Sequence, residues 1–173
     1  MSVVERWNGR FFEDFEVGDI YRNPLGRTIT DVDNVWFTLL TMNTNQNHFN
    51  VEYAKRSPFG KLVVNSGFTI ALVLGQSVPD VSQNAFANLS MDIRLPHPVF
   101  VGDTIYTESL VKSKRGSSSR PYAGIVSVLT RGLNQDGKVC VEFERNVFVY
   151  KKDAPHVAAH FPEAETPIEE AGR

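Results

Sequence analysis

The chain changes its hydrophobic pattern once along its length, from helical spacing in the first half to strand-like alternation in the second. From Asp31 to about Met42, apolar residues recur at the three- and four-residue spacing of a helix. Thr30 has the type and position of an N-cap, and Asp33 can serve as the acidic partner of a capping box. We therefore predict a helix here, with an apolar face formed by Val32, Val35, Trp36, Leu39 and Leu40.

A second helix is predicted over residues 65–78, where the sequence NSGFTIALVLGQSV is apolar on nearly every side. Such a helix must be buried all round, or nearly so. The segment Thr41–Asn50 between the two helices contains four asparagines, whose side chains compete with the backbone for hydrogen bonds. We expect a structured loop there, followed by a short helix over Val51–Arg56.

The second half of the chain predicts antiparallel strands. Residues 105–111 alternate between two faces, and the runs 122–133 and 138–150 are rich in β-branched and aromatic residues. Between the last two runs, Asn134–Gly137 has the composition of a hairpin turn, in which the glycine supplies a positive φ.

Two further strands are expected, the first at an edge of the sheet and the second at an edge or a crossover. One runs between Phe15 and Thr30 and is interrupted at Asn23-Pro24, and the other ends near Leu95, before a proline-rich turn. Early helices followed by long strands indicate the α+β class, with a long antiparallel sheet wrapped around one buried central helix. Residues 1–150 form the predicted domain, and residues 151–173, rich in Ala, Pro and Glu, form a C-terminal tail.

Composition and charge narrow the possible partners. The 173 residues include 18 basic and 20 acidic side chains, a balance that gives no electrostatic footprint for nucleic acid or an anionic membrane. The longest apolar stretch, Phe68–Leu74, is far shorter than the ~20 residues that span a bilayer. The N-terminus does not resemble a secretory signal, so we expect a cytoplasmic protein.

His48 is the main candidate for chemistry, because an imidazole can give or take a proton at neutral pH. The other histidines are His97, which lies between two prolines, and His156 and His160 in the predicted tail. The alternative is that His48 is an ordinary polar loop residue. Cys140 is expected to be a small buried residue of a strand, and the histidines and this cysteine have no metal-ligand spacing.

Several motifs then suggest a family. Asn43, Asn45, Gln46 and His48 stand at the positions of the motif D-x-N-P-x-H, and residues 95–103, LPHPVFVGD, match a proline-rich entry into a strand. With these motifs, residues 11–150 resemble the MaoC-like dehydratases and (R)-specific enoyl-CoA hydratases. The strings DNVWFTLLTMNT, SRPYAGIV and NQDG are similar to the branch that acts on branched C5-dicarboxylyl-CoA thioesters such as mesaconyl-CoA or itaconyl-CoA.

The resemblance implies a single hot-dog fold and a hydro-lyase that adds water across a 2-enoyl-CoA. It implies no metal or redox cofactor, since coenzyme A is the carrier of the substrate, and at least a homodimer, since one sheet leaves the substrate tunnel half built. His48 is expected to be the general base. Asn43 replaces the family's Asp and can orient water but cannot accept its proton, while Asn45 matches the family's Asn and either contacts substrate or holds the turn.

Four residues are candidates for substrate binding. Asn65, Ser66 and Gly67 open the second helix, where backbone N–H groups without intrahelical partners can bind the thioester oxygen. Asn65 can equally be the N-cap of this helix. Arg120 can contact a coenzyme A phosphate or a substrate carboxylate, or it can be an ordinary surface arginine.

Two other functions stay open at this point. An acyl-CoA-binding or regulatory domain with little turnover is favoured by Asn43 in place of the acid. An acyl-CoA thioesterase would use the same fold, but neither the loop Asn43–Asn50 nor the second helix offers the carboxylate that such enzymes commonly place near the reacting carbon.

Overall fold

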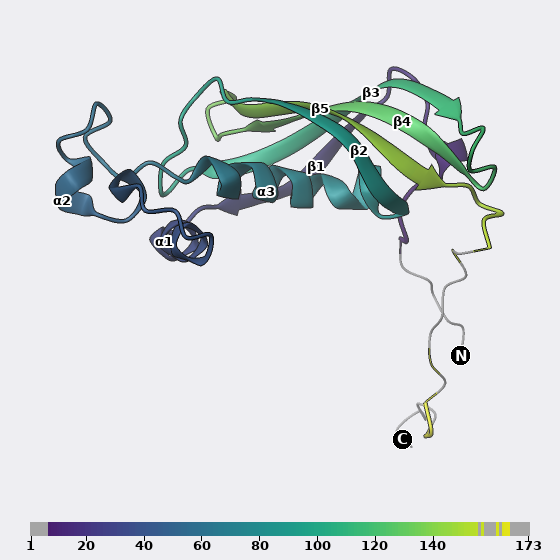
Figure 1. The fold of residues 1–173 in the computed structure, drawn as a ribbon, viewed down its shortest axis with the longest axis horizontal. Coiled ribbons are helices and arrows are strands. Elements are labelled where there is room, and N and C mark those ends of the chain that lie inside the picture. Colours follow the sequence, from purple (N-terminus) through teal and green to yellow (C-terminus); the bar gives the residue numbers. More distant parts are fainter. Residues whose placement is uncertain (1–6, 156, 158–161, 163, 167–173) are drawn as a thin grey trace, which may run out of the picture.

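A computed structural model describes residues 7–155, 157, 162 and 164–166. Within them, five strands form one antiparallel sheet in the order β1-β3-β4-β5-β2 (Figure 1). The edge positions of β1 and β2 agree with the sequence prediction. The bounds of the strands are β1 Ile20–Thr28, β2 Ala85–Arg94, β3 Thr104–Gly116, β4 Ala123–Leu133 and β5 Val139–Tyr150.

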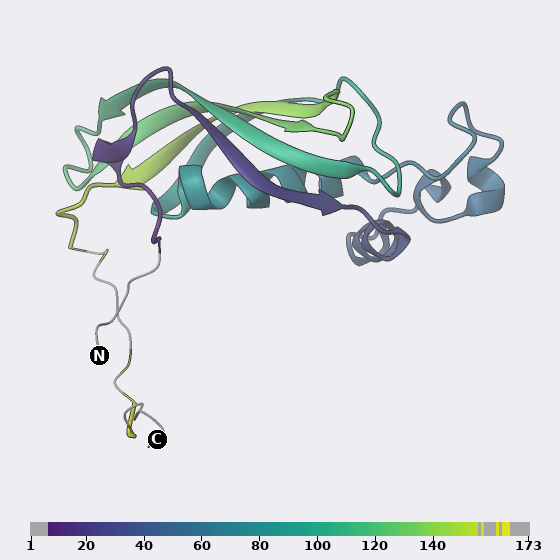
Figure 2. The same cartoon turned by 180° about the vertical axis from the view of Figure 1, so that it is seen from behind.

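The helices lie on one side of this sheet and beyond one of its ends (Figures 1 and 2). The central helix α3 runs beneath the concave face of the sheet, while α1 and α2 lie near its N-terminal end. This arrangement confirms the α+β class. The bounds of the helices are α1 Asp31–Leu40, α2 Val51–Ala54 and α3 Ser66–Ser77, with shorter helical turns at Phe12–Asp14, Gln46–His48 and Val78–Ser82.

Helix α3 is less enclosed than its apolar sequence predicts. Thr69, Val73 and Ser77 are buried, but Ala71 and Gly75 on the side away from the sheet are exposed. The sheet therefore covers one side of α3, and within the described chain its other side stays open. A composition that is apolar all round thus reflects more burial than this single chain provides.

Helix α1 begins as predicted, with a complete capping box. The hydroxyl of Thr30 accepts a hydrogen bond from the N–H of Asp33 at 3.3 Å, and the Asp33 carboxylate accepts one from the N–H of Thr30 at 2.8 Å. Its predicted apolar face is exposed, however, with Trp36 76% and Leu40 83% accessible. The buried side of α1 is polar because it carries the hydrogen bonds of the candidate site.

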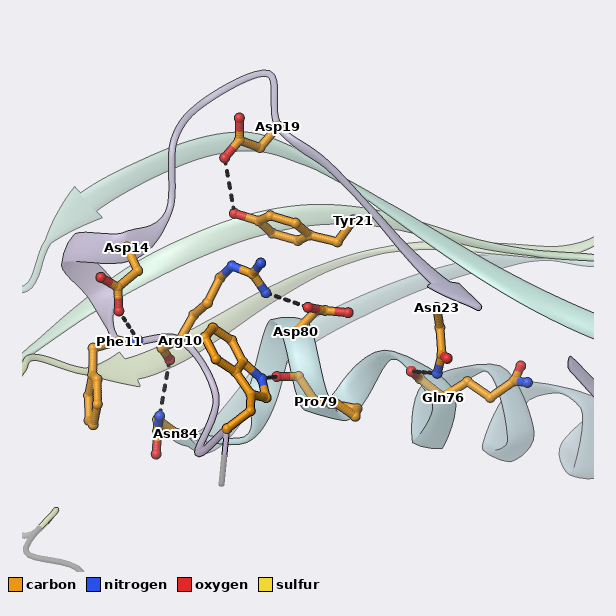
Figure 3. Close-up of polar contacts among 11 residues, drawn as sticks. Arg10, Phe11, Asp14, Asp19, Tyr21, Asn23, Gln76, Pro79, Asp80 and Asn84 are labelled. Carbon is orange, nitrogen blue, oxygen red and sulfur yellow. Dashed lines mark hydrogen bonds and ion pairs between the residues drawn. The ribbon is translucent and has the colours of Figure 1, made fainter. Parts of the chain in front are cut away.

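The N-terminal segment fixes the far end of α3, opposite the candidate site (Figure 3). The Trp7 indole donates to the carbonyl of Pro79 at 3.2 Å, and Arg10 forms an ion pair with Asp80. The Arg10 guanidinium also stacks over the ring of Tyr21 at 3.9 Å from its centroid. These contacts hold the π-helical turn Val78–Ser82 between α3 and the sheet.

The predicted hairpin turn and the end of the last strand are found, whereas the predicted C-terminal tail is not tested. Gly137 adopts a φ of 76°, as the Asn134–Gly137 hairpin requires. Strand β5 ends at Tyr150, and the predicted tail over 151–173, with His156 and His160, lies mostly outside the described residues and stays a prediction. None of the described helices is long and apolar enough to cross a membrane.

Candidate active site

The loop that carries His48 is held by asparagine side chains. The Asn43 carboxamide oxygen accepts the N–H of Asn45 at 2.9 Å, and the Asn45 oxygen accepts the N–H of Asn47 at 3.1 Å. Asn45 is thereby the N-cap of the turn Gln46–His48. This places two of the predicted residues in a structural role, which is the ordinary use of Asn in turns.

His48 is half-buried, and its ring orientation is set by a backbone carbonyl. The Nδ1 atom lies 2.9 Å from the carbonyl oxygen of Val63. Since a carbonyl oxygen only accepts, Nδ1 must carry the proton of this bond. In the neutral ring Nε2 then has a free lone pair, which is the form that a general base needs.

Asn34 ties this arrangement to the two helices. Its side chain is fully buried on α1 and donates to the carbonyl oxygens of His48 at 2.8 Å and Val63 at 3.2 Å. Its own oxygen accepts the N–H of Asn65 at 2.9 Å. One carboxamide therefore connects α1, the histidine loop and the start of α3, and it satisfies three backbone groups.

The N-terminus of α3 is capped in a way that leaves one amide available. Asn65, 5% exposed, accepts the N–H of Gly67 at 2.9 Å and donates to the Thr38 hydroxyl at 3.1 Å. A side chain at Gly67 would place its Cβ 3.2 Å from the Asn65 oxygen and the Phe37 ring, so glycine lets α1 approach. The N–H of the exposed Ser66 has no acceptor among the described residues, so it can bind a ligand oxygen.

His48 and Ser66 line the same cavity, which has a volume of about 290 Å³. This is the lower end of the size range of small-molecule sites. The loop and α3 form one wall of the cavity, and the start of β5 and the β2–β3 connection form the other. The polar and titrating side chains on its lining are those of His48, Ser66, Thr69, His97 and Cys140.

The structure brings together only part of the predicted site. His48 and Ser66 face the cavity, Asn65 and Gly67 support it from behind, and Asn43 and Asn45 lie in the loop without lining it. Arg120 stacks over the Phe148 ring at 4.8 Å, beyond the start of β4. Because the cavity lies toward the other end of that strand, roughly 30 Å separate the two, and the ligand role of Arg120 stays a prediction.

Sequence reasoning assigned no role to three residues that shape the site. Asn34 and Thr38 are polar residues at helical spacing within an apolar helix, and this pattern was the available signal. His97 lies between two prolines in the proline-rich motif over residues 95–103, and it lines the cavity. Their roles depend on contacts with segments that are distant in the sequence.

Cys140 adds no charge to the site. Cys140 is buried as predicted, and its burial raises the pKa of the thiol, so it is held as the neutral thiol at neutral pH. Among the described residues, no three His, Cys, Asp or Glu side chains come together as metal ligands. That the reaction needs no metal and no redox cofactor stays a prediction.

A single antiparallel sheet over one helix, with a histidine loop at the helix N-terminus, defines the class of MaoC-like hot-dog proteins. A sequence model of the mesaconyl-CoA hydratase family matches residues 2–166. The chain belongs to this family.

Individual relatives agree with this membership. The chain is 35% identical to the mesaconyl-CoA hydratase of Cereibacter sphaeroides over 90% of its own length and 46% of the relative. The structure of a MaoC domain protein dehydratase from Chloroflexus aurantiacus matches with a TM-score of 0.82 and 30% identity, over 98% of this chain and 47% of that one. A Mycobacterium tuberculosis protein with a double hot-dog fold shares the fold at a TM-score of 0.76 and 19% identity. The match covers 97% of this chain and 54% of that one.

The chain spans less than half the length of several curated relatives, 46% of the mesaconyl-CoA hydratase and 41% of the beta-methylmalyl-CoA dehydratase of Chloroflexus aurantiacus. About half of the double hot-dog protein is enough to match nearly all of this chain. The described residues thus correspond in extent to one of two hot-dog modules in such proteins.

Proposed function

We propose that this protein is an enoyl-CoA hydratase, a hydro-lyase that reversibly adds water to a branched C5-dicarboxylyl-CoA such as mesaconyl-CoA. The observation that carries the proposal is the pairing of two groups in one cavity. His48 presents a free Nε2 lone pair, and the N–H of Ser66, at the start of a twelve-residue helix, has no acceptor in the described part of the chain. Family membership supports the same reaction class.

The proposed reaction uses these two groups in sequence. The thioester carbonyl accepts a hydrogen bond from Ser66, whose position at the positive end of α3 stabilises the enolate oxygen. His48 Nε2 takes a proton from a water molecule as the water oxygen bonds to C3 of the double bond. The resulting imidazolium returns a proton to C2, so that the thioester carbonyl re-forms and His48 is neutral again.

Asn43 does not prevent this reaction, because one base can move both protons. Its carboxamide oxygen is used by the N–H of Asn45, and the residue shapes the loop that positions His48. Steering of the water by the Asn43 amide stays a prediction. A carboxylate at this position would add a second titrating group, which the sequence of steps above does not need.

A second candidate function is an acyl-CoA-binding domain with little turnover. The replacement of the family's acid by Asn43 favours it, since the amide cannot accept a proton. A thioesterase is less well supported, because the residues that line the described cavity include neither Asp nor Glu. The cavity would hold an acyl thioester in all three cases.

We also propose a homodimer, in which the sheets of two copies join. The open side of α3 and the exposed apolar residues of α1, Val32, Trp36, Leu39 and Leu40, support this proposal, because neighbouring exposed apolar side chains are typical of interfaces. A cytoplasmic location and the absence of nucleic-acid and membrane partners stay predictions from the sequence.

The proposed function is tested by incubation with crotonyl-CoA, mesaconyl-CoA and itaconyl-CoA, while the loss of the enoyl absorbance is followed. The hydratase predicts loss of absorbance with at least one of these substrates and no release of free thiol. Release of coenzyme A thiol would identify a thioesterase instead. Binding of the thioesters with neither change would identify the acyl-CoA-binding domain.

A further inference from the structure

His97 is a second histidine on the wall of the candidate active site. Its Nδ1 atom lies 3.0 Å from the carbonyl oxygen of Val139, so the ring is oriented by a backbone acceptor, as His48 is. Pro96 and Pro98 restrict the backbone on both sides of it. The N–H of Val64 donates to the carbonyl of Val99 at 2.8 Å, which ties this turn to the residues before α3.

The two histidines come from different elements that line the cavity. His48 and Ser66 come from the loop and helix, whereas His97 comes from the connection between β2 and β3, and Cys140 from the start of β5. A substrate with its carbonyl at Ser66 and its double bond at His48 has its reacting end at the loop and helix. In a cavity of about 290 Å³, the far end of a short acyl chain then comes near the other lining residues, His97 among them.

A dicarboxylyl substrate carries a charge for which the site needs a partner. Such a thioester brings a free carboxylate into the cavity, where the exposed ring of His97 can pair with it. Of the side chains that line the cavity, His48 and His97 can carry a positive charge. His48 must be neutral to act as the base, which leaves His97 as the partner of the carboxylate.

The hydrogen bond of the ring fits this role. When imidazole is protonated, both of its nitrogens donate. Nδ1–H of His97 would keep its bond to Val139, and Nε2–H would donate to the carboxylate of the ligand. Charge-assisted hydrogen bonds of this kind are about twice as strong as neutral ones.

We infer that His97 binds the free carboxylate of a dicarboxylyl-CoA substrate and gives the site its preference for such substrates over monocarboxylyl-CoA thioesters. This inference rests on the proposed function for the position of the substrate. It adds a specificity residue on the sheet side of the cavity, separate from the groups that move protons.

The test compares two saturated thioesters of equal chain length, which bind without turnover. Dissociation constants of succinyl-CoA and butyryl-CoA are measured by calorimetry for the wild type, His97→Gln and His97→Lys. For His97→Gln we expect about tenfold weaker binding of succinyl-CoA, because its carboxylate loses a charge-assisted hydrogen bond. Binding of butyryl-CoA, which has no free carboxylate, should change less than about twofold. His97→Lys keeps a cation and should preserve most of the preference for succinyl-CoA.

Each other result overturns the inference. Equal changes for both thioesters, or no change for either, would show that His97 does not recognise the carboxylate. Equal loss of the preference in both variants would show that the positive charge is not what matters. These results leave hydration by the wild type unaffected, whereas wild-type protein that binds neither thioester would contradict the proposed function as well.

Discussion

The carbonyl oxygen of Val63 accepts two hydrogen bonds, from His48 Nδ1 at 2.9 Å and from the Asn34 amide at 3.2 Å. The bond from His48 fixes the neutral tautomer with a free Nε2, and Asn34 fixes the carbonyl itself. Catalytic histidines commonly have a partner that sets the proton position in this way. The proposed base is therefore positioned by the backbone, and the described residues that line the cavity include no carboxylate.

Replacement of Asn34 should weaken both the fold and the catalysis. Asn34→Leu leaves the carbonyl oxygens of His48 and Val63 and the N–H of Asn65 with lost partners, each costing about 1–3 kcal/mol if it stays buried. We expect a lower free energy of unfolding in urea. At temperatures well below the transition, kcat should fall at least about tenfold with a smaller change in KM, because the histidine is displaced.

Thr38→Val is the matched control on the same face of α1. It removes only the acceptor of the Asn65 side-chain amide and leaves both carbonyl bonds of Asn34 in place. It should therefore cost stability with little effect on kcat. Equal losses of kcat in the two variants would show that Asn34 acts through general stability and not through the position of His48.

Asn43 separates the enzyme from the acyl-CoA-binding domain. Asn43→Ala removes the acceptor of the Asn45 N–H and should lower kcat/KM at least about tenfold on one enoyl-CoA, because the loop that carries His48 loosens. Asn43→Asp keeps an acceptor at this position and should retain more activity than Asn43→Ala. Wild-type activity equal to that of Asn43→Ala, with a large gain in Asn43→Asp, would instead favour the binding domain.

Much of the fold could be predicted because its signals are local. The capping box at Thr30 and Asp33 and the N-cap at Asn65 are formed as their sequence spacing indicates. The turn that ends at Gly137 also follows from four adjacent residues. His48 was identified from a motif and Ser66 from its place at the start of a helix, and the structure brings both to one cavity.

The remainder depended on contacts between distant segments. Periodicity shows that α1 has two faces, but it does not show that the polar face with Asn34 is the buried one. That choice is made by Val63 and Asn65, which lie about thirty residues further along the chain. For the same reason, the approach of His97 to the cavity becomes visible only when β2, β3 and β5 are assembled.

The capping box of α1 should make the free energy of unfolding depend on pH in the acid range. Burial alone would raise the pKa of Asp33, but hydrogen bonds from Thr30 and Arg27 outweigh it, and the pKa lies below 3.8. Because the folded-state pKa is the lower one, this stabilisation is present above pH 3.8 and is lost as pH falls through the folded-state value.

Asp33→Asn should therefore reduce the free energy of unfolding by about 0.5–1 kcal/mol at pH 7. The difference from the wild type should shrink as the pH is lowered below 3.8, as measured by urea denaturation. Asp31→Asn, at an exposed position in the same helical turn, is the control and should cost less. A difference that is the same at pH 7 and in acid would rule out the charge of Asp33 as its cause.

The homodimer predicts a solution mass twice the 19.4 kDa of the chain at micromolar concentration. The two sheets should join edge to edge and bury well over about 1,000 Å². Leu89 on edge strand β2 is 47% exposed, and Leu89→Lys should weaken the association because charge on an edge strand opposes pairing. Light scattering that gives a monomer for the wild type would contradict the proposal.

The most direct test of the central claim, that His48 is the base of a hydratase, is the hydration of mesaconyl-CoA by the wild type and by His48→Gln. Glutamine is polar and similar in reach but cannot take a proton, so kcat should fall about 100-fold or more. Binding of succinyl-CoA should stay nearly unchanged, since His48 does not pair with the carboxylate. A His48→Gln variant that hydrates mesaconyl-CoA at more than about a tenth of the wild-type rate would contradict the account.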